Sequence, residues 1–424
     1  MEGDTRVNTR RTVIFGSLLL CTFLGIQPLF QQLGAIPEFK EQSEISISQV
    51  SGILSHVIQV EPVIGETNAV MASNMEESEV IQVSYKLFGI FPLKTSQIEV
   101  VPDIKLLPGG QSIGVSLQAK GVMVVGQAAV TGTDGKQNYP AKEAGIEVGD
   151  VILKIDDQEV KTDQDVANAI HQAGQKQGFS NLVCLRNGQI IQKRIITVYC
   201  SETNRYRVGL YVRNEAAGVG TLTFYEPQTR KYGALGHVIN DADTNQKIEV
   251  ANGSVIASSI YAIEKGRRGH PGEKVGSFVN QTLFTGNIEK NSISGIFGTM
   301  QGKILNPYFK EAIPVAWEAE IKEGPAKIYT VLDGEKIEEY EVQIERIMHN
   351  RTDSKNMVIR VTDQRLLDKT GGIIQGMSGS PIVQDGKIIG AVTHVFVNDA
   401  TRGYGVFIQN MIKEAGLVSN KEAA

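Results

Sequence analysis

Short runs of β-branched and apolar residues, separated by turns rich in Gly, Asn and Asp, fill the C-terminal half of the chain. The runs 381–383 and 387–393 flank Gln384-Asp385-Gly386, a turn signal typical of a β-hairpin. A third run leads into 409–415, whose apolar spacing suits a short closing helix. Further β-runs predict an all-β region from about residue 200: 207–212, 220–224, 247–250, 304–305 and 339–347.

A different pattern lies upstream, where residues 140–157 read as a helix, a Gly-containing turn and an apolar strand. This stretch resembles the PDZ signature. Residues 108–115 look like that fold's carboxylate-binding loop entering a strand, and 162–173 look like its groove helix, which Thr162 and Asp165 would cap. The resemblance implies that a peptide adds an edge strand beside residues 113–117. The implied peptide-binding residues are Gly110, Ile113, Gly114 and Val115. A purely structural use of the module remains the alternative.

The pattern of residues at the N-terminus bears on where in the cell the protein is located. Residues 12–30 are uncharged and largely apolar, long enough to span a membrane, and Arg6, Arg10 and Arg11 precede them. Positive residues before a span predict that the bulk of the chain is exported. A cleavable signal peptide is the competing interpretation, but residues 33–35 make a poor small-x-small cleavage site, which favours a retained anchor.

The amino-acid composition does not change these predictions of fold and location. With 41% hydrophobic residues and a net charge of −5, the chain is an ordinary folded protein with no charge signal for nucleic acid. Cys21 lies in the apolar span, so only Cys184 and Cys200 could pair in the exported part. Neither a His-Glu-x-x-His motif nor a cysteine pair with ligand spacing occurs, so no metal and no cofactor are expected.

The strongest chemical motif is Gly376-Met377-Ser378-Gly379-Ser380-Pro381, because Gly-x-Ser-Gly-x-Pro is how trypsin-like folds present a nucleophilic serine. The glycines permit a tight turn that lifts the Ser378 hydroxyl out. They also leave the backbone N–H groups of Gly376 and Ser378 free to bind an oxyanion. An α/β-hydrolase elbow is excluded, since that motif is Gly-x-Ser-x-Gly followed by a helix.

A general base must come from six histidines. His237 follows an apolar stretch, precedes an acidic turn, and lies far enough upstream of Ser378 to leave room for one barrel between base and nucleophile. His394 is the chief rival, but its strand corresponds to the wall that carries the substrate backbone. The other four are expected to be loop, surface or packing residues: His56, His171, His270 and His349.

Asp363 is the best candidate for the acid that fixes the imidazole tautomer, because it directly follows the strand-like run 357–362. Most two-barrel proteases take this acid from the first barrel, so Asp241 and Asp243 stay open as alternatives. The ordinary reading of Asp363, a carboxylate at a strand end, also stays open at this point.

Residues 371–408 contain Ala-Val-Thr-His-Val-Phe-Val-Asn-Asp and Gly-Tyr-Gly as well as the serine motif. Together with the anchor and the PDZ-like module, they resemble the stage IV sporulation protein B serine peptidase family of endospore-forming bacteria. The resemblance covers essentially the whole chain and implies a triad of Ser378, His237 and Asp363. It further implies secretion into the space between the two forespore membranes, self-cleavage in trans, and cleavage of a regulator of an intramembrane metalloprotease. That cleavage would release the processing of a sigma factor precursor.

The sequence therefore predicts a mainly β protein: a PDZ domain followed by a trypsin-like two-β-barrel serine protease domain, with an N-terminal transmembrane anchor. The expected parts are a tail at 1–11, the anchor at 12–30, a membrane-proximal region at 31–97, the PDZ domain at 98–198 and the peptidase at 199–424. Expected partners are protein substrates, including other copies of the chain, and the membrane, but no nucleic acid. Two other functions stay open: a PDZ adaptor with an inactive protease domain, and a periplasmic quality-control protease.

Overall fold

The computed structural model describes residues 41–42, 58–62, 79–88, 90–279, 283–349 and 351–418. The predicted span 12–30 lies outside these ranges. Among the helices described, none is both long and apolar enough to cross a membrane. The chain divides into two compact units, Met1–Pro102 and Asp103–Ala424.

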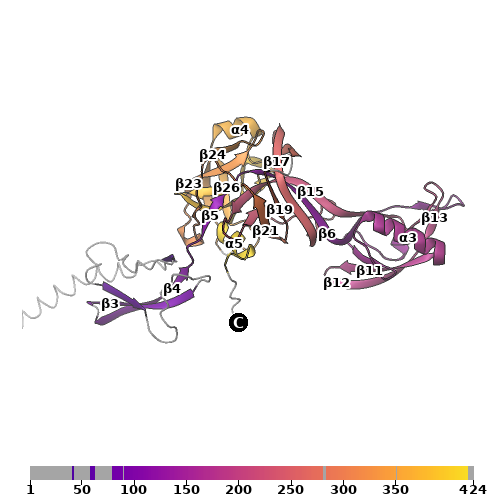
Figure 1. Ribbon diagram of the computed structural model, residues 1–424, viewed down its shortest axis with the longest axis horizontal. Helices are drawn as coiled ribbons and strands as arrows, with labels where there is room; N and C mark the ends of the chain where they lie inside the picture. The colour runs from indigo at the N-terminus through magenta and orange to yellow at the C-terminus, as the bar shows by residue number, and fades with distance from the viewer. Residues whose placement is uncertain are drawn as a thin grey trace, which may run out of the picture. The chain divides into compact units, whose positions relative to one another are not determined.

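The first unit contains a four-stranded sheet in the order β1-β4-β3-β2. Its strands are β1 (Glu41–Gln42), β2 (Ile58–Pro62), β3 (Glu79–Leu87) and β4 (Phe91–Val101). The chain turns back after β3 at Phe88, whose φ of 53° is left-handed. β3 and β4 form the long hairpin drawn in indigo in Figure 1.

The second unit ends in a closed six-stranded barrel in the order β23-β24-β25-β28-β27-β26. Its strands are β23 (Gly324–Val331), β24 (Ile337–Ile347), β25 (Met357–Val361), β26 (Pro381–Gln384), β27 (Lys387–Phe396) and β28 (Asp399–Phe407). Inward-facing residues such as Ile328, Ile344 and Ile359 fill it. The predicted hairpin is confirmed, with Asp385 and Gly386 both at positive φ, as a two-residue hairpin turn requires. The helices α4 (Gln364–Thr370) and α5 (Ile408–Glu414) complete this barrel.

Another barrel closes within the larger sheet, because β6 and β15 pair at the ends of the order β6-β17-β19-β21-β16-β15. Its strands are β6 (Ser112–Gln127), β15 (Leu210–Tyr225), β16 (Lys231–Ala234), β17 (Val250–Glu264), β19 (Phe284–Asn287) and β21 (Gly295–Gly302). Shorter elements flank it: β5 (Lys105–Pro108), β18 (Glu273–Phe278), β20 (Lys290–Ser292), β22 (Ile313–Pro314) and the 3-10 helix η2 (Glu318–Glu320). The fold is therefore two six-stranded barrels, as in trypsin-like proteases. The expected β-run at 304–305 is not a strand.

The PDZ module is an insertion between β6 and β15, which run from it into the first barrel (Figure 1). Between these strands lie β7 (Val130–Thr131), β8 (Gln137–Asn138), α2 (Pro140–Glu143), β9 (Val151–Ile155), β10 (Gln158–Glu159), α3 (Asp163–Gln177), β11 (Phe179–Arg186), β12 (Gln189–Ile196), β13 (Val198–Cys200) and β14 (Arg205–Arg207). The predicted capping box is present at the start of α3, where Thr162 and Asp165 bond each other's backbone N–H groups. Cys184 and Cys200 are buried free thiols.

The structure corrects the expected peptide-binding edge. Residues 113–117 of β6 pair with β15 on one side and with β17 on the other, so neither edge is free for a peptide. The four residues expected to bind peptide instead build the first barrel: Gly110, Ile113, Gly114 and Val115. The sequence signal was misleading because a Gly-rich turn entering an apolar strand has the same pattern in a barrel as in a PDZ groove.

Candidate functional site

Ser378 lies on the tight turn between α4 and β26, at the boundary of the two barrels. Gly376 and Gly379 on either side have φ of 87° and 93°, conformations that favour glycine. A Cβ atom on Gly379 would lie 2.0 Å from the carbonyl oxygen of Thr221 in the first barrel. The hydroxyl of Ser378 donates a hydrogen bond to the carbonyl oxygen of Thr393, at 2.7 Å.

The carbonyl groups of this turn are held by the rest of the protein. Lys274 N–H donates to Gln375 O (3.0 Å), and Thr221 donates through Oγ1 to Gly376 O (2.7 Å) and through its N–H to Ser378 O (3.0 Å). The carbonyl of Met377 accepts from the N–H of Ser380 (2.9 Å). We call residues 375–379 the oxyanion loop, because the N–H groups of Gly376 and Ser378 could bind an oxyanion there.

In a trans peptide the C=O and N–H groups point in opposite directions. Anchoring Gln375 O and Met377 O within the protein therefore turns the N–H groups of Gly376 and Ser378 to the opposite side of the loop. Within the described ranges, neither N–H donates to any acceptor. Two unpaired N–H groups beside a serine hydroxyl are what an oxyanion hole needs.

His237 follows β16 on a turn in which Leu235 and Gly236 both have positive φ. A Cβ atom on Gly236 would lie 2.9 Å from Cγ2 of Thr393, so the turn rests on β27. The rings of His237 and His394 have centroids 5.0 Å apart. Because Thr393 accepts from Ser378 and the next residue faces His237, β27 brings the predicted nucleophile and base to one place.

The His237 imidazole is not yet bonded to the serine. Its Nδ1 lies 2.8 Å from the carbonyl oxygen of Val238. Burial lowers the pKa of His237, although the bond to Val238 opposes the shift. Although His394 as a whole residue is exposed, desolvation of its ring, followed by the neighbouring His237, also lowers the pKa of His394 to about 4. Both rings therefore remain neutral at neutral pH, as a general base must be before reaction.

Asp363 sits at the N-cap of α4, where its carboxylate accepts from Arg365 N (2.9 Å) and pairs with the Arg365 guanidinium (2.7 Å). It also accepts from the N–H of Glu341. The Arg365 hydrogen bond holds the pKa of Asp363 below its usual range. Among the described residues no hydrogen bond joins Asp363 to His237. The open alternative Asp241 bonds its own turn at Thr244 and pairs with Arg213.

The remaining histidines have other surroundings. His171 accepts from the N–H of Tyr206 in the PDZ module, His349 pairs with Glu318, and the carbonyl of His270 accepts from Arg267 N–H. Three residues of the site were missed from the sequence: Thr221, Lys274 and Thr393. A threonine or lysine in a β-run carries no signal of this role, because only the fold brings it to the serine.

The PDZ module has a free edge at Leu210–Arg213, the start of β15. These four residues pair with β6 on one side, and no described strand pairs with the other. Leu210 and Val212 pack against the cluster that contains Val166 and Ile170 of α3. A strand edge beside a helix is the arrangement in which a peptide adds by β-augmentation.

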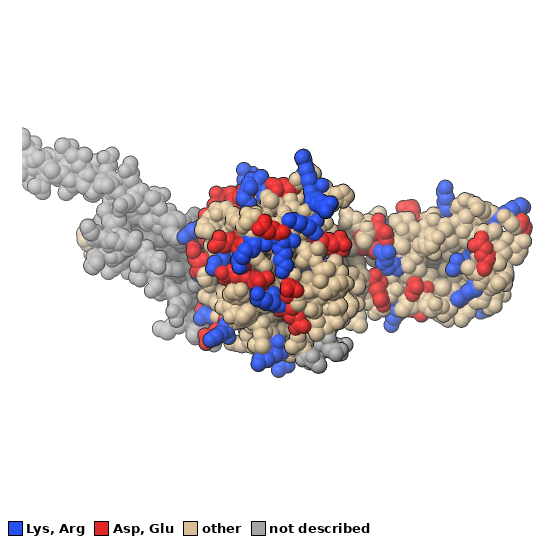
Figure 2. Space-filling view, turned by 90° about the horizontal axis from the view of Figure 1, so that it is seen from above, with Lys and Arg blue, Asp and Glu red and all other residues tan. Residues whose placement is uncertain are grey.

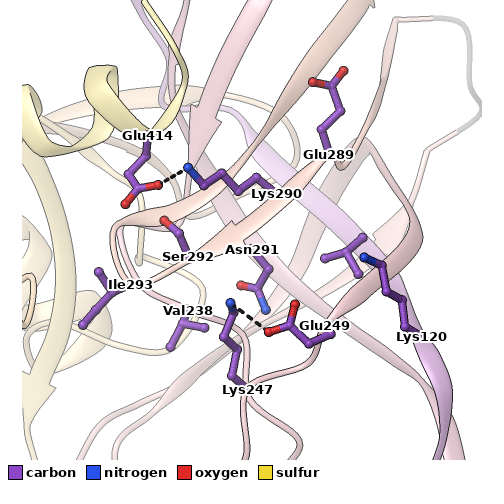
Figure 3. A pocket seen from close by; sticks show the side chains of 11 residues that line it. Lys120, Val238, Lys247, Glu249, Glu289, Lys290, Asn291, Ser292, Ile293 and Glu414 are labelled. Carbon is purple, nitrogen blue, oxygen red and sulfur yellow. Dashed lines mark ion pairs between the residues drawn. The ribbon is translucent and has the colours of Figure 1, made fainter. Parts of the chain in front are cut away.

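A separate hollow of about 670 Å³ lies beside Val238 (Figure 3). Its charged side chains are largely paired, with Lys290 on Glu414 and Lys247 on Glu249. On the face seen in Figure 2, positive and negative residues are interspersed without a large patch of one sign. Within the described ranges, no three His, Cys, Asp or Glu side chains lie close enough to hold a metal ion.

Comparison with known proteins agrees with this geometry. The SpoIVB peptidase S55 family matches residues 204–412, and the PDZ domain family matches residues 133–177. No curated protein sequence gives a significant match.

The similar solved structures have low sequence identity to this chain. The PDZ domain of the SdrC-like protein from Listeria monocytogenes is 21% identical, over 22% of this chain and 87% of that one, with a TM-score of 0.17. The active form of the Rv3671c protease from M. tuberculosis is 14% identical, over 48% and 76% of the two chains, with a TM-score of 0.26. Human heparin binding protein is 13% identical, over 46% and 82%, also with a TM-score of 0.26. These likenesses carry no functional conclusion.

The family match spans the serine, its oxyanion loop and His237, and it joins a PDZ domain in the same chain. Residues 204–412 form a peptidase domain of the SpoIVB peptidase S55 family, and the protein is a serine endopeptidase.

Proposed function

We propose that Ser378 is the nucleophile, His237 the general base and Asp363 the acid of this endopeptidase. Ser378 Oγ attacks a peptide carbonyl carbon, His237 takes the hydroxyl proton and returns it to the leaving amine, and water then releases the acyl group. The N–H groups of Gly376 and Ser378 stabilise the oxyanion, which typically contributes about 3 to 4 kcal/mol. The arrangement of these two N–H groups is the observation that carries the proposal.

We interpret the geometry described as that of a resting site. Ser378 bonds Thr393, His237 bonds Val238, and Asp363 bonds Arg365. Catalysis requires Ser378 to turn towards His237, and Asp363 to exchange Arg365 for the imidazole. Substrate bound beside β27 would favour the first change by competing for the Thr393 carbonyl oxygen.

We further propose that the enzyme is membrane-anchored and exported, that it cleaves other copies of itself in trans, and that it cleaves a regulator restraining an intramembrane metalloprotease. That cleavage would signal between forespore and mother cell by activating a sigma factor precursor. The apolar segment 12–30 and the family support this proposal.

The decisive experiment uses the Ser378→Ala chain as a tagged substrate. Wild-type protein should cleave it, and His237→Ala protein should not. Cleavage that persists in Ser378→Ala enzyme would refute the assignment of the nucleophile. Function in sporulating cells retained by Ser378→Ala would favour the adaptor, whereas degradation of any unfolded protein would favour a quality-control protease.

We propose that the PDZ module recruits substrate along Leu210–Arg213. The module can be removed without breaking the barrel, because Gln127 and Leu210 pair directly across the β6–β15 hairpin. Replacing residues 128–209 with Asn-Gly supplies a two-residue hairpin turn at that point. This variant should retain a reactive Ser378 but lose cleavage in trans. Unchanged cleavage in trans would contradict a recruiting role.

A further inference from the structure

Lys274 is an unusual residue for its position. It lies in β18, only 4% of it is exposed, and no carboxylate among the described residues pairs with it. Its Nζ donates instead to two threonine hydroxyls, Oγ1 of Thr330 at 2.7 Å and Oγ1 of Thr221 at 3.3 Å. An unpaired buried amine costs stability, so its retention needs a reason.

The position of Lys274 supplies that reason, because it touches the oxyanion loop in three ways. Its backbone N–H donates to Gln375 O at 3.0 Å. Its Cβ, Cγ and Cδ atoms lie 3.1 to 3.2 Å from where a Cβ of Gly376 would be, so the stem lies along that glycine. Its Nζ reaches the same Thr221 hydroxyl that donates to Gly376 O at 2.7 Å.

The chemistry of the threonine hydroxyl links these contacts. A hydroxyl has one hydrogen to donate and accepts through its lone pairs. When Lys274 donates to Thr221 Oγ1, the hydroxyl hydrogen must point away from the amine, towards Gly376 O. Without the amine, the hydroxyl can rotate and the Gly376 carbonyl loses a fixed partner.

We propose that Lys274 is a positioning residue that acts through Thr221 to hold the oxyanion loop in the orientation that exposes the N–H groups of Gly376 and Ser378. This inference rests on the proposed role of Ser378 and deepens it.

Burial lowers the pKa of Lys274 to about 7, so both its ammonium and its amine forms occur near neutral pH. The neutral amine still has two N–H groups, enough for Thr221 and Thr330 together. Positioning therefore persists in both protonation states. The side chains that face the amine from β15 and β23 are these two hydroxyls, and burial is the only cause of the shift.

The test uses the full chain and a fluorophosphonate probe, which forms a serine O–P bond and releases fluoride. Labelling of Ser378 reports nucleophile and oxyanion hole without any protein substrate. The variants are Lys274→Met, Thr221→Val, Thr221→Ser and the double variant Lys274→Met with Thr221→Val. Lys303→Met, at an exposed lysine, controls for the loss of a positive charge.

Removing an oxyanion donor itself costs about 10² to 10³ in rate. Loss of a residue that only positions the loop should cost less, about tenfold in labelling rate and in kcat for the tagged Ser378→Ala substrate. KM should change less than about twofold, since ground-state binding is untouched. Thr221→Ser, which keeps the hydroxyl, should recover most of the rate that Thr221→Val loses, and Lys303→Met should match wild type. The double variant should be no slower than Thr221→Val, because both changes break one relay.

A wild-type labelling rate in Lys274→Met, or losses that multiply in the double variant, would overturn the inference while leaving Ser378 as the nucleophile. If Lys274→Met does not fold, the comparison of Thr221→Val with Thr221→Ser tests the inference instead. Equal labelling rates of Ser378 in these two variants would overturn it. Absence of Ser378 labelling in wild-type protein would overturn the proposed function and this inference together.

Discussion

The hydroxyl of Ser378 donates to the backbone carbonyl of Thr393, at 2.7 Å, and not to the imidazole of His237. This bond ties Ser378, the proposed nucleophile, to the strand that also faces His237. In this arrangement the hydroxyl of Ser378 holds a backbone carbonyl and makes no hydrogen bond to the proposed base.

The first prediction concerns that bond. Ser378→Ala leaves a partly buried carbonyl without its donor, so the free energy of unfolding should fall by about 1 kcal/mol. Chemical denaturation measures it, with Ser277→Ala, at an exposed serine of β18, as the matched control. A variant as stable as wild type would mean that Ser378 does not rest on Thr393 in solution.

The Asp363→Asn variant separates the role of Asp363 as N-cap of α4 from its proposed role as the acid of the triad. Asparagine also serves as an N-cap, so α4 should keep its first turn and thermal stability should change little apart from the Arg365 ion pair. As the acid of the triad, however, Asp363 needs its charge, and kcat should fall by about 10⁴-fold. A near-normal kcat would leave Asp363 as a helix cap only, and His237 would act without it.

The lowered pKa of His237 sets the acidic limb of the pH profile. A base must be neutral to accept a proton, and burial keeps this imidazole neutral below its ordinary pKa of 6.5. We expect kcat/KM to hold its plateau down to a pH below 6.5. The rate of fluorophosphonate labelling against pH provides the measurement, and a midpoint at or above 6.5 would contradict it.

Lys274 should make stability depend on pH. Its pKa falls from 10.5 to about 7 on folding, so between these values the unfolded chain binds a proton that the folded chain has lost. Stability therefore rises with pH in this window, by about 1.4 kcal/mol per unit from this group. Lys274→Met should be more stable than wild type at pH 6, and its advantage should shrink above pH 7. An advantage that is constant from pH 6 to 9.5 would rule out titration of Lys274.

Position 379 requires glycine because a Cβ atom would clash there, and also because its backbone φ is positive. Gly379 and Gly386 both have positive φ, at 93° and 79°, so alanine at either position costs about 1 to 2 kcal/mol in backbone strain. A Cβ on Gly379 would also lie 2.0 Å from Thr221 O, whereas nothing lies within 4 Å of one on Gly386. Gly379→Ala should therefore lower the melting temperature clearly more than Gly386→Ala and reduce Ser378 labelling. Equal effects would mean that the loop shifts freely.

The sequence by itself determined the serine turn, the hairpin after it, and α3 with its capping box. These depend on local chemistry: glycines that permit positive φ, an Asp-Gly turn, and a Thr-Asp pair spaced for an N-terminus. Each acts within a few residues, so the pattern is readable along the chain.

Only the tertiary structure decided that residues 108–117 build the first barrel and not a peptide groove. The alternation of polar and apolar residues along a strand does not specify which other strands pair with it. The same holds for the PDZ insertion within a barrel hairpin, and for Thr221 and Lys274 beside the oxyanion loop. These residues lie more than 100 positions from Ser378, and barrel closure, through long-range hydrogen bonds and burial, brings them to it.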